Sequence, residues 1–220
     1  MIPYKDDNPT SVFPFITISI IVANVLVFLY EVMAPSGMEK LAYSYGAIPH
    51  YILNFEKVQP IHPVLSIFSA MFMHGGVFHI AGNMLYLWIF GNNIEDKLGH
   101  LRFIFFYFFC GIVAAYANAI AGPHSLIPMI GASGAISGIL GAYLLLFPRA
   151  MVHTLIFLGF FVTVVKIPAL IVIGFWAVIQ LVNGLLSTGF AAEGGVAWFA
   201  HIGGFLVGIL TIKLWLPRRA

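Results

Sequence analysis

Long apolar runs separated by short polar stretches make up most of this chain. Six of these runs are close to the length of about 20 residues that a helix needs to cross the hydrocarbon layer of a membrane. They lie at about residues 13–31, 76–94, 101–121, 131–147, 168–187 and 197–216. Backbone polar groups in hydrocarbon must be satisfied within their own segment, so we interpret each run as a helix. The pattern predicts an all-α, six-transmembrane-helix bundle that forms a single domain over residues 1–220.

Two further stretches contain apolar residues without fitting a seventh span. Residues 151–165 are too short to cross a membrane, are rich in β-branched and aromatic side chains, and lie between charged and proline residues. We interpret this stretch as an interfacial connection. Residues 32–66 form a long outer loop with scattered apolar side chains, and we expect this loop to lie in the membrane interface.

Composition supports a membrane protein and excludes other classes. The chain is 61% hydrophobic and only 8% charged, whereas soluble domains contain about 25% charged residues, so most of its surface must face lipid. A net charge of +2 provides no basic stripe for phosphate groups, which excludes nucleic acid as a partner. The single cysteine, Cys110, excludes an internal disulfide and a cysteine-rich metal site.

Basic residues predict the orientation, because cytoplasmic loops of membrane proteins are enriched in Lys and Arg. With both termini in the cytoplasm, only Lys40 and Lys57 fall outside. The eight basic residues on the inside are Lys5, Lys97, Arg102, Arg149, Lys166, Lys213, Arg218 and Arg219. The first span is expected to be retained rather than cleaved as a signal peptide, since Asp6 and Asp7 precede it and Pro14 interrupts its start.

Polar side chains inside a membrane are costly, so they mark candidate functional positions. Three spans that run from outside to inside begin with such residues: His79 in the second, Ser133 in the fourth and His201 in the sixth. Each lies 16 to 18 residues before the basic residue that ends its span. At about 1.5 Å per residue, all three are expected roughly 24 to 27 Å above the cytoplasmic interface, a little below the outer surface.

Glycine spacing indicates that two of these helices approach closely. Gly134 and Gly138 form a pair four residues apart in the fourth span, and Gly204 and Gly208 form another in the sixth. Such pairs let helix backbones pack nearly in contact. Alone they indicate only the assembly of a bundle, but a serine beside one pair and a histidine beside the other favour a shared site.

A serine hydroxyl becomes a nucleophile when a neighbouring histidine takes its proton, so Ser133 and His201 are candidate catalytic residues. A third, carboxylate member is not available, because the acidic residue nearest to His201 in this part of the chain is Glu193, eight residues earlier. We therefore expect a dyad. Packing and a neutral group such as Ser137, one helical turn after Ser133, would then orient His201.

A reaction at a carbonyl also needs donors for the developing oxyanion. His79 and Asn83 are four residues apart, so both project from one face of the second span. The backbone N–H of Ser133, in the first turn of its helix, is a further candidate donor. His74 lies one or two turns outward, where we expect it to be a structural hydrogen-bond partner.

Other interpretations of these residues stay open. Ser133 could bond its own backbone, and His201 could serve as a helix contact or line a pore. Metal catalysis by His74 and His79 is disfavoured, because no His-Glu-x-x-His spacing and no nearby carboxylate accompanies them. A haem held by His79 and His201 is formally possible. We expect no metal and no cofactor.

Three motifs together resemble the rhomboid family of intramembrane serine proteases. They are Gly131-Ala132-Ser133-Gly134; Ala200-His201-Ile202-Gly203-Gly204 with Gly208; and His74, His79 and Asn83 spaced as His-x4-His-x3-Asn. The resemblance implies that Ser133 is the nucleophile, that His201 is the base and that His79 and Asn83 belong to the oxyanion site. It implies structural roles for the motif glycines, and for Gly91, Glu95, Gly99 and Arg102 in a turn after the second span.

Two positions depart from the family pattern. Many members carry a tyrosine one turn after the catalytic serine, where this chain has Ser137. Many also carry a Trp-Arg pair in the first outer loop, whereas residues 33–65 contain neither residue type.

The resemblance implies an intramembrane serine endopeptidase that hydrolyses a peptide bond in or near the outer part of transmembrane segments. Its partners would be membrane-protein substrates and the lipid bilayer, and its location the plasma membrane of a prokaryote with the site open to the outside. Residues 189–197 are a candidate lid and the fifth span a candidate lateral gate. The alternatives are a catalytically silent protein that binds transmembrane helices, and a transporter or channel, which the clustering of polar residues near one face disfavours.

Overall fold

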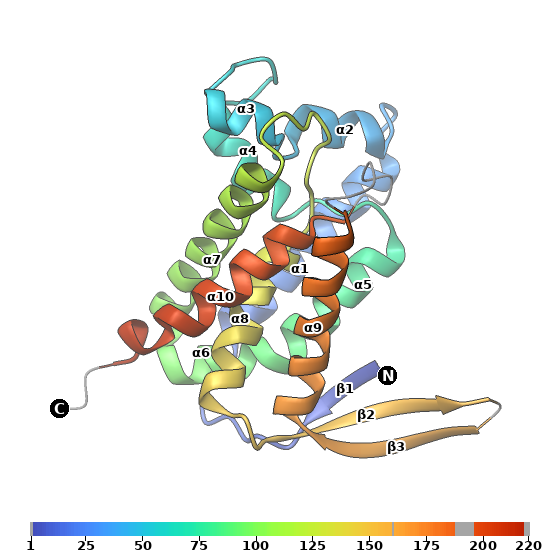
Figure 1. Ribbon diagram of the computed structural model, residues 1–220, viewed down its shortest axis with the longest axis vertical. Helices are drawn as coiled ribbons and strands as arrows, with labels where there is room; N and C mark the ends of the chain where they lie inside the picture. The colour runs from blue at the N-terminus through green and yellow to red at the C-terminus, as the bar shows by residue number, and fades with distance from the viewer. Residues whose placement is uncertain (1, 160, 188–195, 218–220) are drawn as a thin grey trace.

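The computed structural model describes residues 2–159, 161–187 and 196–217, and most of them are helical (Figure 1). The helices are α1 (Phe15–Met33), α2 (Met38–Tyr45), α3 (Pro49–Asn54), α4 (Pro63–Ala70), α5 (Val77–Tyr86), η1 (Leu87–Gly91), α6 (Asn92–Leu98), α7 (His100–Ala121), α8 (Ser133–Leu146), α9 (Ala169–Ser187) and α10 (Trp198–Trp215). The strands are β1 (Ile2–Asp6), β2 (Met151–Leu158) and β3 (Phe161–Pro168). The strands lie at one end of the molecule, called here the sheet end, and α2, α3 and α4 lie at the opposite end (Figure 1).

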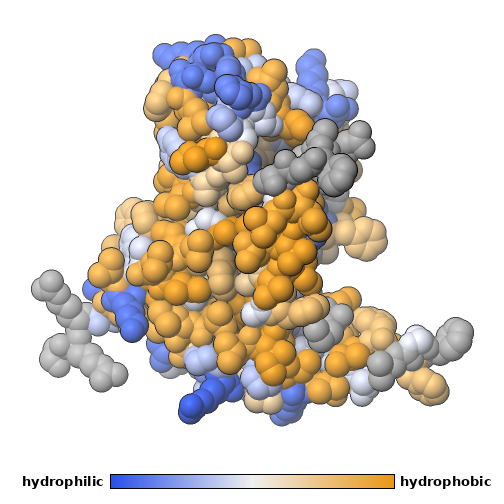
Figure 2. All heavy atoms as spheres, in the orientation of Figure 1, coloured by the Kyte–Doolittle hydropathy of each residue, from blue (hydrophilic) through white to orange (hydrophobic). Residues whose placement is uncertain are grey.

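Four helices of the described chain, α1, α7, α9 and α10, are long and apolar enough to cross a membrane. Their outward faces carry large apolar side chains, such as Leu26 at 61% exposed, Leu210 at 76% and Leu214 at 83%. Figure 2 shows apolar side chains covering the middle of one face, with hydrophilic ones gathered toward the two ends. Such a surface is unfavourable in water and favourable in lipid, so the chain is an integral membrane protein.

The second predicted span is a helix in three pieces. The backbone stays in the right-handed helical region through Leu87 and Asn92, where α5 passes into η1 and η1 into α6. The middle piece, η1, is a π-helical segment with wider turns than an α-helix. One continuous helix therefore extends from Val77 to Leu98.

The fourth predicted span, α8, is the central helix of the bundle. It has only 14 residues, and every residue from Gly134 to Tyr143 is buried. A Cβ atom added at Gly204 would clash with the carbonyl of Gly134, and one added at Gly208 with the carbonyl of Gly138. The close approach of α8 and α10 that the glycine spacing predicts is therefore present.

The expectation of an all-helical chain is wrong at the sheet end. β2 and β3 form an antiparallel hairpin in which Met151 pairs with Pro168, and β1 adds to β2 to give the order β1-β2-β3. The β-branched and aromatic residues of this stretch favour strands over a helix. Phe157, Phe161 and Val162 remain exposed on the hairpin, which projects sideways from the helices (Figure 1).

Two neighbouring aspartates attach β1 to the rest of the protein. The Asp7 carboxylate accepts a hydrogen bond from Lys166 Nζ at 2.9 Å and lies 2.6 Å from His153 Nε2. These bonds from Lys166 and His153 lower the pKa of Asp7. Asp6 is buried and accepts a bond from the Tyr143 hydroxyl at 2.5 Å, and its burial raises its pKa. The N-terminal strand is thus tied to both the hairpin and α8.

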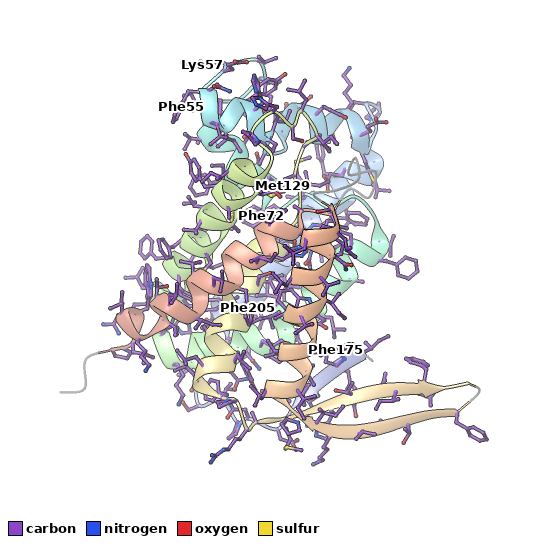
Figure 3. The ribbon with its side chains drawn as sticks, viewed as in Figure 1. Phe55, Lys57, Phe72, Met129, Phe175 and Phe205 are labelled. Atoms are coloured by element: carbon purple, nitrogen blue, oxygen red, sulfur yellow. The ribbon has the colours of Figure 1, made fainter. Side chains whose placement is uncertain are left out.

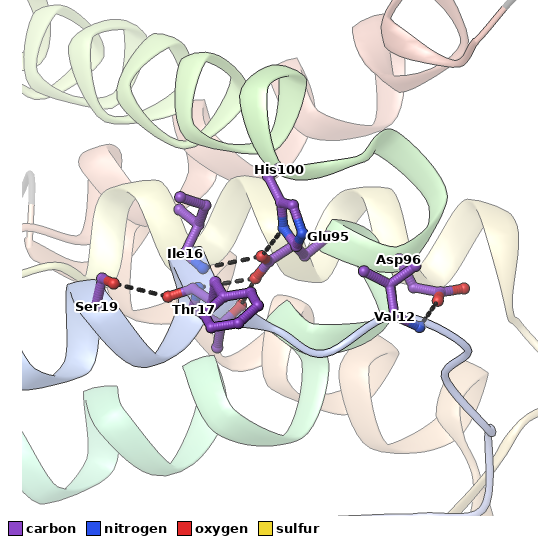
Figure 4. Close-up of polar contacts among 8 residues, drawn as sticks. Val12, Ile16, Thr17, Ser19, Glu95, Asp96 and His100 are labelled. Atoms are coloured by element: carbon purple, nitrogen blue, oxygen red, sulfur yellow. Dashed lines mark hydrogen bonds and ion pairs between the residues drawn. The ribbon is translucent and has the colours of Figure 1, made fainter.

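A buried carboxylate fixes the start of α1 (Figure 4). Glu95, which is 0% exposed, accepts bonds from the backbone N–H groups of Ile16 at 2.9 Å and Thr17 at 2.8 Å. The Thr17 hydroxyl donates to it at 2.7 Å, and His100 Nδ1 lies 2.6 Å away. The first N–H groups of a helix have no partner inside the helix, so Glu95 satisfies two of them and joins α6 to the first turns of α1 and α7.

The predicted outer loop, residues 32–66, is more ordered than a loop. It contains α2, α3 and the first part of α4, and it buries Leu41, Ile48 and Ile52. Phe55 and Lys57 lie at the end of the molecule opposite the sheet (Figure 3). The apolar side chains scattered through this segment therefore pack within the protein as well as on its surface.

Candidate active site

Ser133 and His201 meet where α8 and α10 begin. Ser133 is the first residue of α8, and His201 lies in the first turn of α10. His201 Nε2 is 2.8 Å from Ser133 Oγ, which is a hydrogen-bonding distance. The structure thus brings together the hydroxyl and the imidazole that the sequence places at one level on separate helices.

The second nitrogen of the same imidazole contacts a residue that is not among the predicted site residues. His201 Nδ1 lies 2.7 Å from Oε1 of Gln180, a buried residue of α9. Nε2 of Gln180 donates to the carbonyl of Trp176, one turn earlier, at 3.2 Å. Gln180 and Asn183 are amide side chains in a largely apolar span, and this signal could have identified Gln180 as a candidate.

Ser137 does not take the position expected for it beside His201. Its hydroxyl donates to the backbone carbonyl of Ser133 at 2.6 Å, within the same helix. This is a common local bond for a serine in a helix, because the carbonyl one turn earlier is always within reach. The expectation that Ser137 orients His201 is therefore corrected: Gln180 contacts the imidazole instead.

A cavity of about 650 Å³ lies between α5, α8, α9 and α10. Ser133, His201, His79 and Asn83 line it together with Trp176 of α9. Nδ2 of Asn83 is buried and has no hydrogen-bond partner among the residues that the structure describes. A buried donor without a partner is costly, so this group is available to a molecule that enters the cavity.

Gly131 brings the chain before Ser133 close to these side chains. Its φ of +124° is rarely adopted by other residues, and an added Cβ would lie 2.7 Å from His79 Nε2 and 3.6 Å from Asn83 Nδ2. The Gly131 N–H donates to the carbonyl of Ala70 at 2.8 Å. Only glycine fits here without displacing the imidazole of His79.

His74 packs against His79, but its side chain does not make the expected hydrogen bond, because neither ring nitrogen has a partner among the described residues. Its backbone N–H donates to the buried carboxylate of Glu31 at 3.1 Å, and its ring packs edge-on against that of His79 with centroids 5.0 Å apart. His79 Nδ1 in turn accepts a bond from the N–H of Gly75 at 3.3 Å. These contacts hold the first turn of α5 beside the cavity.

α9 contributes the aromatic ring of Trp176 to the wall of the cavity. Trp176 packs near His201 with ring centroids 6.1 Å apart, and 5.8 Å from Phe205 of α10, which is labelled in Figure 3. Of the candidate lid at residues 189–197, only Val196 and Ala197 belong to the described residues, and both line the cavity. The remainder of that segment lies outside the described residues.

The histidines that line the cavity bear on the metal and haem alternatives. Among the described residues, no group of three or more His, Cys, Asp or Glu side chains is placed to hold a metal ion. Both ring nitrogens of His201 already face partners, Ser133 and Gln180. A haem iron bound to His201 would have to displace one of these two contacts.

Comparisons with known proteins agree on one family. RHOMBOID-like protein 1 of Arabidopsis thaliana is 30% identical over 166 residues, which cover 76% of this chain and 38% of that protein. Rhomboid protease GluP of Bacillus subtilis (strain 168) is 30% identical over 217 residues, covering 98% of this chain and 37% of that protein. The chain thus spans less than half the length of these relatives.

The family comparison covers the whole candidate site. The sequence model of the rhomboid domain matches residues 62–218, which include His79, Asn83, Ser133 and His201. This range is well over half of the chain, and the relatives match it at about one residue in three. The chain therefore belongs to the rhomboid family.

Proposed function

We propose that this protein is an intramembrane serine endopeptidase that cuts a peptide bond in or near the outer part of transmembrane segments of other membrane proteins. The observation that carries the proposal is the 2.8 Å contact between Ser133 Oγ and His201 Nε2, at the wall of a cavity between helices. A relative whose name states that it is a protease supports it.

The topology that we propose has six spans, with α5, η1 and α6 as the second and α8 as the fourth. Both termini and the sheet end face the cytoplasm, as the distribution of basic residues favours. The exposed Phe157, Phe161 and Val162 of the hairpin then lie at the cytoplasmic interface. The site opens to the outside of a prokaryotic plasma membrane, and residues 1–220 act as one membrane domain.

In the first step His201 takes the proton of Ser133 and the serine oxygen attacks the carbonyl carbon of the substrate. The carbonyl oxygen becomes negative and accepts hydrogen bonds from Asn83, His79 and the Ser133 N–H. The unpartnered Nδ2 of Asn83 supports this assignment, because the oxyanion would supply its missing acceptor.

In the second step the protonated His201 gives its proton to the leaving amine as the C–N bond breaks, and the acyl fragment stays on Ser133. A water molecule then attacks the ester and His201 takes the proton of that water. His201 gives this proton to the Ser133 oxygen as the ester C–O bond breaks, and the acid product leaves. The neutral imidazole and the serine hydroxyl are restored together.

Access for a substrate is proposed between α5 and α9. Phe78 of α5 and Trp176 of α9 both line the cavity, and Phe78 is 94% exposed. A helical substrate keeps its carbonyls hydrogen-bonded and shielded, so it must unwind locally before attack. Targets with Gly, Pro or other helix-weakening residues near the cut are therefore favoured.

A fluorophosphonate probe tests the chemistry, and a reporter transmembrane segment tests the substrate class. Labelling that is lost in Ser133→Ala and His201→Ala, with a cut in the outer part of the reporter mapped by mass spectrometry, is the expected result. Folded wild-type protein that neither reacts with the probe nor cuts the reporter would support the catalytically silent, helix-binding alternative.

A further inference from the structure

The second hydrogen bond of His201 determines whether the imidazole can act as a base. A neutral imidazole carries one N–H, on either Nδ1 or Nε2, and the partner of one nitrogen decides which tautomer is present. Because Nε2 faces Ser133 Oγ, this nitrogen must present its lone pair if it is to accept the serine proton. The proton of the resting imidazole must therefore be on Nδ1.

The contacts of Gln180 determine which atom of its amide faces the imidazole. The carbonyl of Trp176 can only accept a hydrogen bond, so the amide nitrogen of Gln180 must lie toward it, at 3.2 Å. The amide oxygen then faces Nδ1 of His201 at 2.7 Å, and an oxygen can only accept. A flipped amide would set two carbonyl oxygens against each other.

We infer that Gln180 is a positioning residue, which holds His201 in the tautomer protonated at Nδ1 and thereby makes Nε2 the acceptor for the Ser133 proton. The inference rests on the proposed function and adds to it a group outside the three motifs. Gln180 is only 6% exposed, so water does not compete with its hydrogen bond. After proton transfer, the same amide oxygen still accepts the N–H of the imidazolium.

The position of Gln180 also links the base to the helix that we propose as a gate. The buried residues of α9 form two groups, with Ala169, Val172 and Ile173 near the sheet end and Gln180 and Gly184 further along. The contact between Gln180 and His201 thus joins the half of α9 that is farther from the sheet end to α10. An outward movement of α9 would separate the base from its positioning group.

Three variants separate this role from simple packing. Gln180→Leu keeps the approximate size and removes the acceptor, Gln180→Glu keeps an acceptor and adds charge, and Asn183→Leu removes an amide from the next turn of the same helix as a control. We expect Gln180→Leu to lower kcat and the rate of fluorophosphonate labelling roughly 10- to 100-fold, with KM little changed. Asn183→Leu should behave as wild type.

Gln180→Glu gives a readout that packing alone would not move. A carboxylate beside Nδ1 favours the protonated imidazole, so the acidic limb of the pH–rate profile should shift to higher pH while activity is largely retained. Full activity of Gln180→Leu with an unchanged pH profile, in a protein that Ser133→Ala inactivates, would overturn the inference and leave the proposed function standing. A wild-type protein without activity would instead overturn the proposed function.

The tautomer itself can be measured without any variant of Gln180. In ¹⁵N-histidine-labelled wild-type protein, the signals that disappear in His201→Ala identify His201. We expect a protonated Nδ1 and an unprotonated Nε2 at neutral pH. An imidazole protonated at Nε2 would overturn the inference whether or not the Gln180 variants fold.

Discussion

Glu95 and Asn83, two buried polar side chains of the helix that runs from Val77 to Leu98, differ in whether their hydrogen bonds are complete. Near the sheet end, Glu95 accepts hydrogen bonds from two backbone N–H groups and a hydroxyl, and it also contacts an imidazole. Near the cavity, Nδ2 of Asn83 is buried and finds no partner among the described residues. Since an unsatisfied buried group costs about 1–3 kcal/mol, the first arrangement stabilises the fold and the second weakens it.

This difference distinguishes a residue that stabilises the fold, Glu95, from a residue that is available to bind a substrate, Asn83. A carboxylate whose bonds are complete has nothing left to offer a substrate, whereas a donor without a partner can bind one. Gly131 accentuates the contrast, because it lets the backbone pass beside His79 and Asn83 without filling the cavity. The prediction that follows is that changes at the cavity alter activity, and changes at Glu95 alter stability.

The largest effect is expected at Ser133. Replacing it by alanine removes the nucleophile, so cleavage of a reporter segment should fall roughly 10,000-fold or more while thermal unfolding in detergent stays close to wild type. Ser137→Ala is the matched control, since among the described residues the hydroxyl of Ser137 bonds to the carbonyl of Ser133 and not to His201. If Ser133→Ala still cleaves the reporter, Ser133 is not the nucleophile and the assignment of chemistry to the cavity is wrong.

The second largest effect is expected at Glu95, and on stability. Glu95→Ala leaves the N–H groups of Ile16 and Thr17 and the Thr17 hydroxyl without their acceptor, so the free energy of unfolding should drop by about 3 kcal/mol or more. Equilibrium unfolding in a denaturing detergent measures this. The fraction that remains folded should cut the reporter at the wild-type rate. A variant that is stable but inactive would contradict the assignment of Glu95 to structure.

Asn83→Ala should give the reverse result. Loss of one oxyanion donor lowers kcat by roughly 100- to 1,000-fold, with a small change in KM. Unfolding should be unchanged or slightly shifted toward higher stability, because the variant lacks the unsatisfied buried Nδ2 of Asn83. Steady-state kinetics measures the change in kcat, and an unfolding curve of the same variant measures the change in stability. If the variant is less stable but has a normal kcat, Asn83 has a structural role, as Glu95 does, and is not an oxyanion donor.

The smallest effect is expected at Asp7, on the pH dependence of stability. Its pKa is lowered in the folded protein by the bonds with Lys166 and His153, from an ordinary value of 3.8. The contribution to stability is therefore present above pH 3.8 and is lost as the pH falls through the lowered value. Asp7→Asn should remove this dependence, and the effect is small because the carboxylate is exposed. Unfolding temperatures across this range of pH measure it.

Much of this architecture could be predicted from the apolar runs. The run at 101–121 corresponds to α7 (His100–Ala121) and the run at 168–187 to α9 (Ala169–Ser187), because the length of an apolar segment reports directly on a membrane helix. The stretch at 151–165 was harder. A short apolar run has no periodicity that distinguishes a strand from a connection, and pairing with residues 2–6 is a contact between distant parts of the chain.

The site shows the same division. Spacing within one helix predicts that His79 and Asn83 share a face, and depth predicts that Ser133 and His201 share a level. The partner of His201 Nδ1 depends on how α9 is rotated against α10, which spacing along a single helix does not contain. Ser137 lies one turn after Ser133 in the sequence but bonds to the Ser133 carbonyl, whereas Oε1 of Gln180 lies 2.7 Å from His201 Nδ1.

The π-helical segment Leu87–Gly91 shifts the register of its helix. A π turn holds about one residue more than an α turn, so the part beyond it is rotated by about 100° relative to an uninterrupted α-helix. His79 and Asn83 precede this segment and Glu95 follows it. Deleting one residue from the segment would therefore misalign either the oxyanion donors or the Glu95 carboxylate that binds the start of α1. His79, Asn83 and Glu95 would all still be present in such a variant.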